Sequence, residues 1–185
     1  LLANSQAGFF YPLNWPFWLL LETPYATSAT ILLHLFIASS GLYLVGRSVL
    51  SLSGLAALVA AASFGLGGYL TAQVEHINQL QGLAWLPWFL IAVDLARKGT
   101  RRSWLLAVIA AGGLFALQLL AGHTQTTFIT VVEILIWILV DWLGRRFLPG
   151  TLPEGESQQK TFLLSPLSAL IAGGLLAVAL AAIQL

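Results

Sequence analysis

The 185-residue chain has no cysteine and no methionine, and few of its residues are charged. The absence of cysteine excludes disulfides, thiolate metal sites and cysteine nucleophiles within these residues. Only 8% of the residues are charged, against about 25% in soluble domains, whereas 58% are hydrophobic and the mean hydropathy is +0.88. A soluble core cannot absorb that much apolar surface, so the composition predicts a membrane protein. The net charge of +1 gives no indication of a nucleic acid partner.

Motifs of soluble enzymes are also missing from the sequence. It contains no G-x-S-x-G, no P-loop and no H-E-x-x-H. The segment Gly65-Leu-Gly-Gly68 lies inside an apolar run and indicates close helix packing rather than a phosphate cradle. The chain starts at Leu1 without a methionine and stops within an apolar run at Leu185. We therefore expect it to be part of a longer protein.

The apolar runs predict an all-α polytopic bundle in a single transmembrane domain. Runs of this length suit a hydrocarbon core about 30 Å thick. We predict about six spans, at residues 25–45, 52–72, 80–95, 103–121, 126–142 and 162–185. The third is short and contains Pro87, so we expect it to be kinked or partly interfacial. Small residues at four-residue intervals predict close helix contacts in the second and sixth spans, at Ala57, Ala61 and Gly65 and at Ala169, Gly173, Ala177 and Ala181.

Residues 1–24 do not have the pattern of a span. Polar residues and three prolines interrupt them, and aromatic residues are dense among the polar ones. Aromatic rings of this kind suit the headgroup level of a membrane. We predict an interfacial or re-entrant segment with one short helix at about residues 16–21.

The positions of the basic residues predict the orientation of the chain. Six alternating spans place every Lys and Arg on one side, which the positive-inside rule assigns to the cytoplasm. The predicted cytoplasmic loop 147–161 lies on this side. Residues 1–24, 73–81 and 122–127 then lie on the outer face of a bacterial cytoplasmic membrane. The basic residues are Arg47, Arg97, Lys98, Arg101, Arg102, Arg145, Arg146 and Lys160.

The outer segments are rich in amides and imidazoles and contain no Lys or Arg. Such side chains offer paired donors and acceptors, which suit neutral polyhydroxyl ligands such as sugars. Glu75 beside His76 could hold a divalent cation or transfer a proton. Ordinary hydrophilic loops are the alternative interpretation. The polar residues concerned are Asn4, Gln6, Asn14, Glu22, Glu75, His76, Asn78, Gln79, Gln81, His123 and Gln125.

Two ionisable residues, His34 and Glu133, lie within predicted spans. Both are about 10–14 Å below the outer boundary at 1.5 Å per residue. Each belongs to a polar stripe on its own helix, so the sequence predicts two facing walls of a cavity. Burying ionisable groups in a membrane is costly, which makes them functional candidates. A structural His34–Glu133 pair, or a neutral Glu133 bonded within the bundle, is the alternative, and Gln118 is expected to form a bond between helices.

Several segments together resemble YfhO-like bacterial membrane proteins of the GT-C glycosyltransferase superfamily. They occur in order along nearly the whole chain. They are Leu2-Ala-Asn-Ser-Gln-Ala-Gly-Phe-Phe-Tyr-Pro-Leu-Asn-Trp15, Leu33-His-Leu-Phe36, Glu75-His-Ile-Asn-Gln79, Leu83-Ala-Trp-Leu-Pro-Trp88, Leu119-Leu-Ala-Gly-His-Thr-Gln125 and Ala181-Ala-Ile-Gln-Leu185.

The resemblance implies a GT-C-like fold that transfers a sugar from a polyprenyl-phosphate carrier to an acceptor on the outer face. It implies a catalytic carboxylate, normally an Asp, in the first outer loop. Residues 1–24 would be the end of that loop, and their only acidic residue is Glu22. We therefore expect the Asp to precede Leu1. We expect Glu75 and His76 to be catalytic and to bind a divalent ion such as Mg²⁺ or Mn²⁺. The expected substrate-binding residues are Asn4, Gln6, Asn78, Gln79, His123, Gln125, His34 and Glu133.

Two other functions remain open from the sequence. A multi-span transporter or flippase-like protein would use His34 and Glu133 as a proton relay or substrate path. A non-catalytic membrane scaffold is the third possibility.

Overall fold

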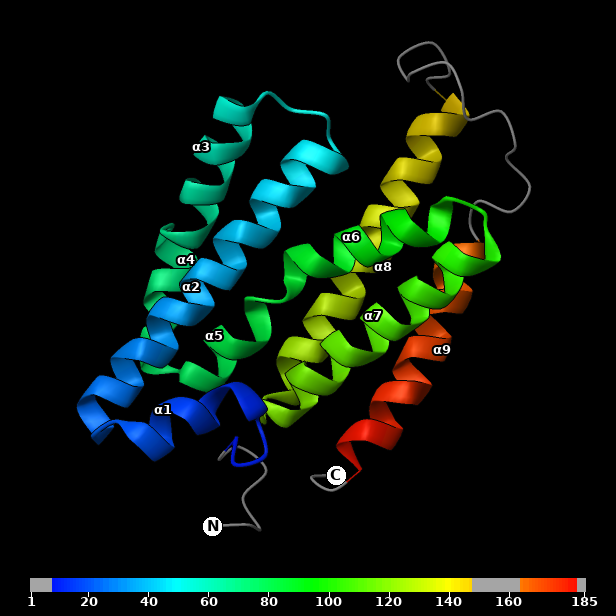
Figure 1. Ribbon diagram of the computed structural model, residues 1–185. Coiled ribbons are helices and arrows are strands. Elements are labelled where there is room, and N and C mark those ends of the chain that lie inside the picture. Colours follow the sequence, from blue (N-terminus) through cyan, green and yellow to red (C-terminus); the bar gives the residue numbers. More distant parts are fainter. Residues whose placement is uncertain (1–7, 148–163, 183–185) are drawn as a thin grey trace.

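The computed structural model describes residues 8–147 and 164–182, and all the regular elements in them are helical (Figure 1). The 3₁₀ turn Pro12–Asn14 precedes the first α-helix, and the 3₁₀ turn Gln73–Glu75 joins the fourth α-helix to the fifth. The helices are α1 (Trp15–Leu20), α2 (Thr23–Ser48), α3 (Gly54–Gly65), α4 (Gly68–Ala72), α5 (Ile77–Leu83), α6 (Leu86–Arg97), α7 (Arg101–Leu120), α8 (Thr124–Phe147) and α9 (Leu164–Ala181).

The helices are long and apolar enough for a membrane protein, which confirms that part of the prediction. Large apolar side chains are exposed along them, such as Phe36, Leu55 and Ile136, as expected for surfaces that contact lipid. By length and composition, five helical stretches of the described chain could cross a membrane: Thr23–Ser48, Gly54–Glu75, Ile77–Arg97, Arg101–Leu120 and Thr124–Gly144. The sixth predicted span contains a shorter apolar helix, Ser165–Ala181, within its described part.

Two of the predicted spans are interrupted helices. The second, predicted at residues 52–72, corresponds to the candidate span Gly54–Glu75, within which α3 ends at Gly65 and α4 begins at Gly68. Glycines have low helix propensity, and Gly67 is extended with φ −68° and ψ 157°. The third span is kinked as predicted, because α5 ends at Leu83 and α6 begins with Pro87 in its first turn.

Both predicted ridges of small residues pack closely against neighbouring helices. Ala57 on α3 is fully buried, and a Cβ added to Gly46 on α2 would lie 3.0 Å from the Ala57 Cβ. On α9, a Cβ added to Gly173 would lie 2.8 Å from the Ala111 Cβ of α7. The absence of side chains at these glycines therefore allows the backbones to approach.

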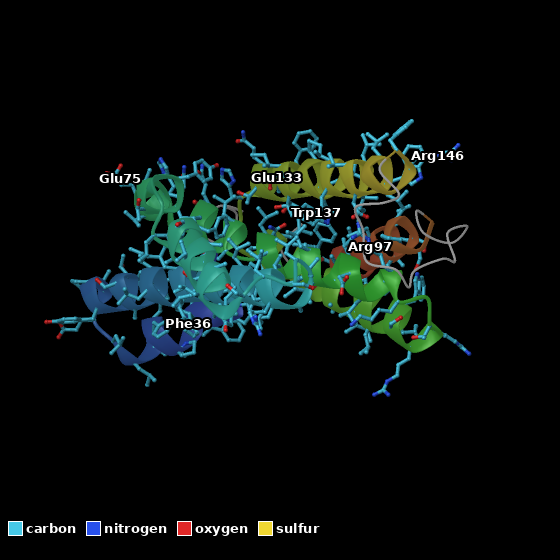
Figure 2. The ribbon with its side chains drawn as sticks, turned by 90° about the horizontal axis from the view of Figure 1, so that it is seen from above. Phe36, Glu75, Arg97, Glu133, Trp137 and Arg146 are labelled. Atoms are coloured by element: carbon cyan, nitrogen blue, oxygen red, sulfur yellow. The ribbon has the colours of Figure 1, made fainter. Side chains whose placement is uncertain are left out.

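The two ends of the bundle differ in chemistry. At the lower end in Figure 1 lie α1, the connection from α4 to α5 and the start of α8; we call this the polar end. At the other, basic end lie the described residues Arg47, Arg97, Lys98, Arg101, Arg102 and Arg146. Figure 2 likewise shows Glu75 at the opposite end from Arg97 and Arg146. This segregation agrees with the predicted alternation of spans, and the cytoplasmic assignment of the basic end remains a prediction.

Candidate functional site

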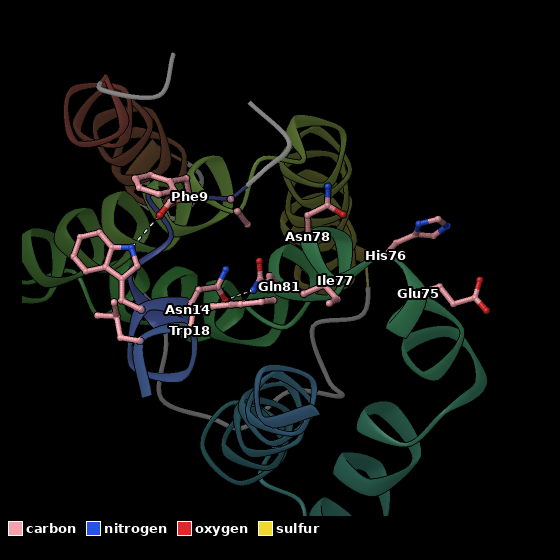
Figure 3. Close-up of a pocket in the computed structure, with 12 residues that line it drawn as sticks. Phe9, Asn14, Trp18, Glu75, His76, Ile77, Asn78 and Gln81 are labelled. Atoms are coloured by element: carbon pink, nitrogen blue, oxygen red, sulfur yellow. Dashed lines mark hydrogen bonds between the residues drawn. The ribbon is translucent and has the colours of Figure 1, made fainter. Parts of the chain in front are cut away.

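A cavity of about 920 Å³ lies at the polar end, between α1 with the residues before it and the segment 75–81 (Figure 3). Its position is set by the short helix α1, which runs across the end of the bundle and buries none of its own residues. The residues that line the cavity are Gly8, Phe9, Asn14, Trp15, Trp18, Leu19, Glu75, His76, Ile77, Asn78, Gln81 and Ala121.

One side of the cavity is aromatic and apolar. It is formed by Phe9, Trp15, Trp18 and Leu19, all of which are exposed. The Trp15 indole N–H donates to the backbone carbonyl of Phe9 at 2.9 Å, which fixes the orientation of that ring. The cavity therefore offers aromatic rings to a ligand on this side.

The other side carries amides. Gln81 Nε2 donates to Asn14 Oδ1 at 2.6 Å and so connects α5 to the N-terminal segment. This bond uses one polar atom of each amide, so the Gln81 carbonyl oxygen and the Asn14 amino group can still bond a ligand. Asn78 adds a third amide to the lining. An acceptor and a donor then lie side by side, which is the pattern that a hydroxyl group needs.

Tyr11 fixes the N-terminal segment to the bundle. Its side chain is fully buried, and its hydroxyl lies 2.7 Å from His34 Nε2. His34 Nδ1 lies 2.7 Å from the Thr30 carbonyl oxygen, which can only accept, so Nδ1 carries the proton. Nε2 of the neutral ring then accepts from Tyr11, and the Tyr11 oxygen accepts from Trp85 Nε1 at 3.0 Å. Each of these bonds has a donor and an acceptor when His34 and Tyr11 are both neutral.

Burial also keeps Tyr11 in the form that this arrangement requires. It raises the pKa of the Tyr11 hydroxyl, an effect that the bond from Trp85 only partly offsets. The hydroxyl therefore remains protonated and can donate to His34.

His34 and Glu133 do not form the two facing walls of a cavity, so that prediction is wrong. His34 is fully buried, bonds Tyr11 and is not part of the cavity lining. Glu133 is exposed on α8, because the buried face of that helix continues from Thr130 to Ile134, four residues on, rather than to Glu133. The two residues that would have formed a proton relay are thus held apart, and His34 acts as a positioning residue for the cavity.

Glu75 and His76 lie at the edge of the cavity, as exposed residues around the 3₁₀ turn. Their side chains point away from Asn14 and Gln81 in Figure 3. Within residues 8–147 and 164–182 no group of three or more His, Cys, Asp or Glu side chains could hold a metal ion. Binding of Mg²⁺ or Mn²⁺ by Glu75 and His76 therefore remains a prediction.

Other predicted site residues lie beside the cavity but do not line it. Gln79 on α5 bonds His123 at 3.0 Å, and His123 bonds Thr126 at 2.7 Å, so this cluster connects α5 to the start of α8. Gln125 is exposed nearby. Asn4 and Gln6 lie outside the described residues.

Gln118 forms the predicted bond between helices. Its Nε2 donates to the Gly82 carbonyl at 2.8 Å and to Thr130 Oγ1 at 2.9 Å, and its side chain is fully buried. It thereby joins α5, α7 and α8 directly beneath the polar end.

No family model, curated protein or solved structure matches this chain. The resemblance to YfhO-like proteins therefore depends on the quoted segments alone, and any function has to be argued from the cavity.

The fold brings together several residues that the sequence pattern did not point to. Trp15 and Trp18 were expected at the headgroup level but not as one side of a cavity. An ion pair between Arg97 and Asp141, 3.3 Å apart, was also missed; it connects α6 to α8 near the basic end. The pairing could not be foreseen, because 44 residues separate the two along the chain.

Proposed function

We propose that this chain is part of a membrane glycosyltransferase-like protein that binds a lipid-linked sugar at the polar end, outside the cytoplasmic membrane. The observation that supports this most directly is the cavity itself, in which amides face aromatic rings beside exposed apolar residues of α1. Polar recognition and contact with lipid thus occur within one site.

The amides suit the hydroxyl groups of a sugar. Asn14 offers a donor and Gln81 an acceptor, and Asn78 offers both kinds of atom. The opposite side offers the faces of Trp15 and Trp18, which carry partial negative charge and attract the C–H groups of a sugar ring. A neutral sugar would be held between these two sides.

The position of α1 suits a ligand with a lipid tail. Leu19 lines the cavity and is 81% exposed, as is the neighbouring Leu20. A short helix that is apolar on its outer surface lies well at the boundary of headgroups and acyl chains. The tail would pass over α1 into the bilayer while the sugar enters the cavity.

Transfer would require an acceptor hydroxyl to attack the anomeric carbon of the bound sugar. The acceptor oxygen forms the new bond, its proton passes to a base, and the carbon–oxygen bond to the carrier breaks, with the phosphate leaving with the electron pair. The resemblance and its place at the cavity edge favour Glu75 as that base, with His76 beside it. The lining contains no Lys or Arg, so stabilisation of the leaving phosphate would come from a metal ion or from other parts of the protein.

Binding and transfer can be tested separately in the full-length protein. We expect Asn78→Ala to weaken binding of a polyprenyl-phosphate-linked sugar about fivefold, since one neutral hydrogen bond contributes about 1 kcal/mol. We expect Glu75→Gln to leave binding unchanged and to lower the transfer rate at least a hundredfold, as a lost general base does.

The matched control for both variants is Thr124→Ala, which changes an exposed polar residue at the same end but outside the cavity lining. Equal affinity of Asn78→Ala and the control would contradict sugar binding in the cavity. An undiminished transfer rate of Glu75→Gln would leave the binding site in place and remove Glu75 from the reaction.

A further inference from the structure

Helix α8 carries an exposed carboxyl group in the middle of an apolar surface. Glu133 is nine residues from the start of α8, about 14 Å below the polar end. It is the only polar residue among the exposed, described residues of α8 between Phe128 and Leu143. Figure 2 shows it on the opposite face of the molecule from Phe36.

A carboxyl group in contact with lipid at this depth has no partner for its hydrogen-bonding atoms. Burial of such a group in hydrocarbon costs several kcal/mol unless it is bonded. Of the five candidate spans, the stretch containing α8 has the smallest buried share, so a large part of its surface can accept another helix.

The exposed side of α8 has the spacing of a helix–helix contact. Glu133, Ile136, Val140 and Leu143 follow one another at intervals of three, four and three residues, and all are exposed. This is the spacing of the seam in a left-handed helix pair. Glu133 is therefore itself a seam residue.

Glu133 would be satisfied by its own counterpart in a second copy. A neutral carboxylic acid both donates and accepts, so two of them can bond each other without any further residue. Two copies inserted in the same orientation present α8 at the same depth, and a twofold axis along the membrane normal places identical faces together. We propose that the exposed face of α8 around Glu133 is the contact between two copies of this chain, with the two carboxyl groups hydrogen-bonded. This contact is independent of the cavity and of sugar binding.

Disulfide cross-linking tests the proposal, because these 185 residues contain no cysteine. The full-length protein in its own membrane would carry Ile136→Cys, and the control would carry Phe36→Cys. Ile136 lies 12 residues from the start of α8 and Phe36 lies 13 from the start of α2, so both thiols are at similar depth on exposed positions. We expect oxidation to yield a covalent dimer for Ile136→Cys and none above background for Phe36→Cys.

A second substitution in the Ile136→Cys background distinguishes the carboxyl contact from chance proximity. We expect Glu133→Leu to lower the dimer yield about five- to thirtyfold, the effect of one strong hydrogen bond between membrane helices. Glu133→Gln should largely preserve it, because an amide also donates and accepts. Equal yields for the two cysteine positions, cross-linking to another protein, or cross-linking within one chain would overturn the proposal.

Discussion

Tyr11 shows how one residue positions the candidate site. Its hydroxyl bonds both His34 and Trp85 and so links these two residues. The same bonds hold the N-terminal segment, which forms one side of the cavity. The sequence predicted that His34 binds a ligand, and it did not reveal the bond to Tyr11, because a histidine in a span gives no sign of its partner. The partner lies 23 residues away and is brought to it by the fold.

We therefore expect Tyr11→Phe to destabilise the protein and to weaken ligand binding. Loss of the hydroxyl leaves His34 Nε2 and Trp85 Nε1 unbonded, which costs about 1–3 kcal/mol for a buried group. The measurement is the free energy of unfolding in detergent, together with sugar affinity. Tyr25→Phe is the control, since Tyr25 is 67% exposed at the start of α2.

The difference in the free energy of unfolding between the unchanged protein and Tyr11→Phe should depend on pH. Burial raises the pKa of Tyr11, so its contribution is fully present below the pKa of an unfolded tyrosine, about 10, and is lost as the pH rises further. An equal loss of stability in the Tyr25→Phe control, or a difference that grows with pH, would contradict the assigned role of Tyr11.

At the scale of elements, the apolar runs predicted the helices well because a membrane-spanning helix needs about 20 apolar residues in succession. They did not show the break at Leu66 and Gly67, which lies within a run that is hydrophobic overall. Hydropathy does not distinguish a continuous helix from an interrupted one, whereas the low helix propensity of successive glycines indicates an interruption. The ridges of small residues were predicted correctly, because residues four apart lie on one helix face and small side chains there let another backbone approach.

The contact between α7 and α9 gives a direct test of that packing. Gly173→Ala would place a Cβ 2.8 Å from the Ala111 Cβ and 3.0 Å from the backbone nitrogen of Gly112, so we expect a loss of about 1–3 kcal/mol. Gly174→Ala is the control, because nothing lies within 4 Å of a Cβ at that position. In detergent, the midpoint temperature of thermal unfolding should be lower for Gly173→Ala than for both the control and the unchanged protein. Equal midpoints for the two variants would mean that α7 and α9 do not pack closely at Gly173.

At the scale of the whole molecule, the candidate site depends on which end of the bundle faces outward. The sequence separated the two ends correctly, because the basic residues recur at every second connection between the predicted spans. It could not show that α1 runs across the polar end to form one side of a cavity, since this follows from contacts between residues far apart, such as Asn14 and Gln81.

The orientation itself can be measured with single cysteines and a membrane-impermeant thiol reagent. We expect Gln125→Cys at the polar end to react in intact cells and Lys98→Cys at the basic end to react only after the membrane is disrupted, because short basic loops are retained in the cytoplasm. Both positions are exposed, so a difference between them reports sidedness rather than burial. Labelling of Lys98→Cys but not Gln125→Cys in intact cells would reverse the orientation. The cavity would then face the cytoplasm, where a sugar carried on an outward-facing lipid could not reach it.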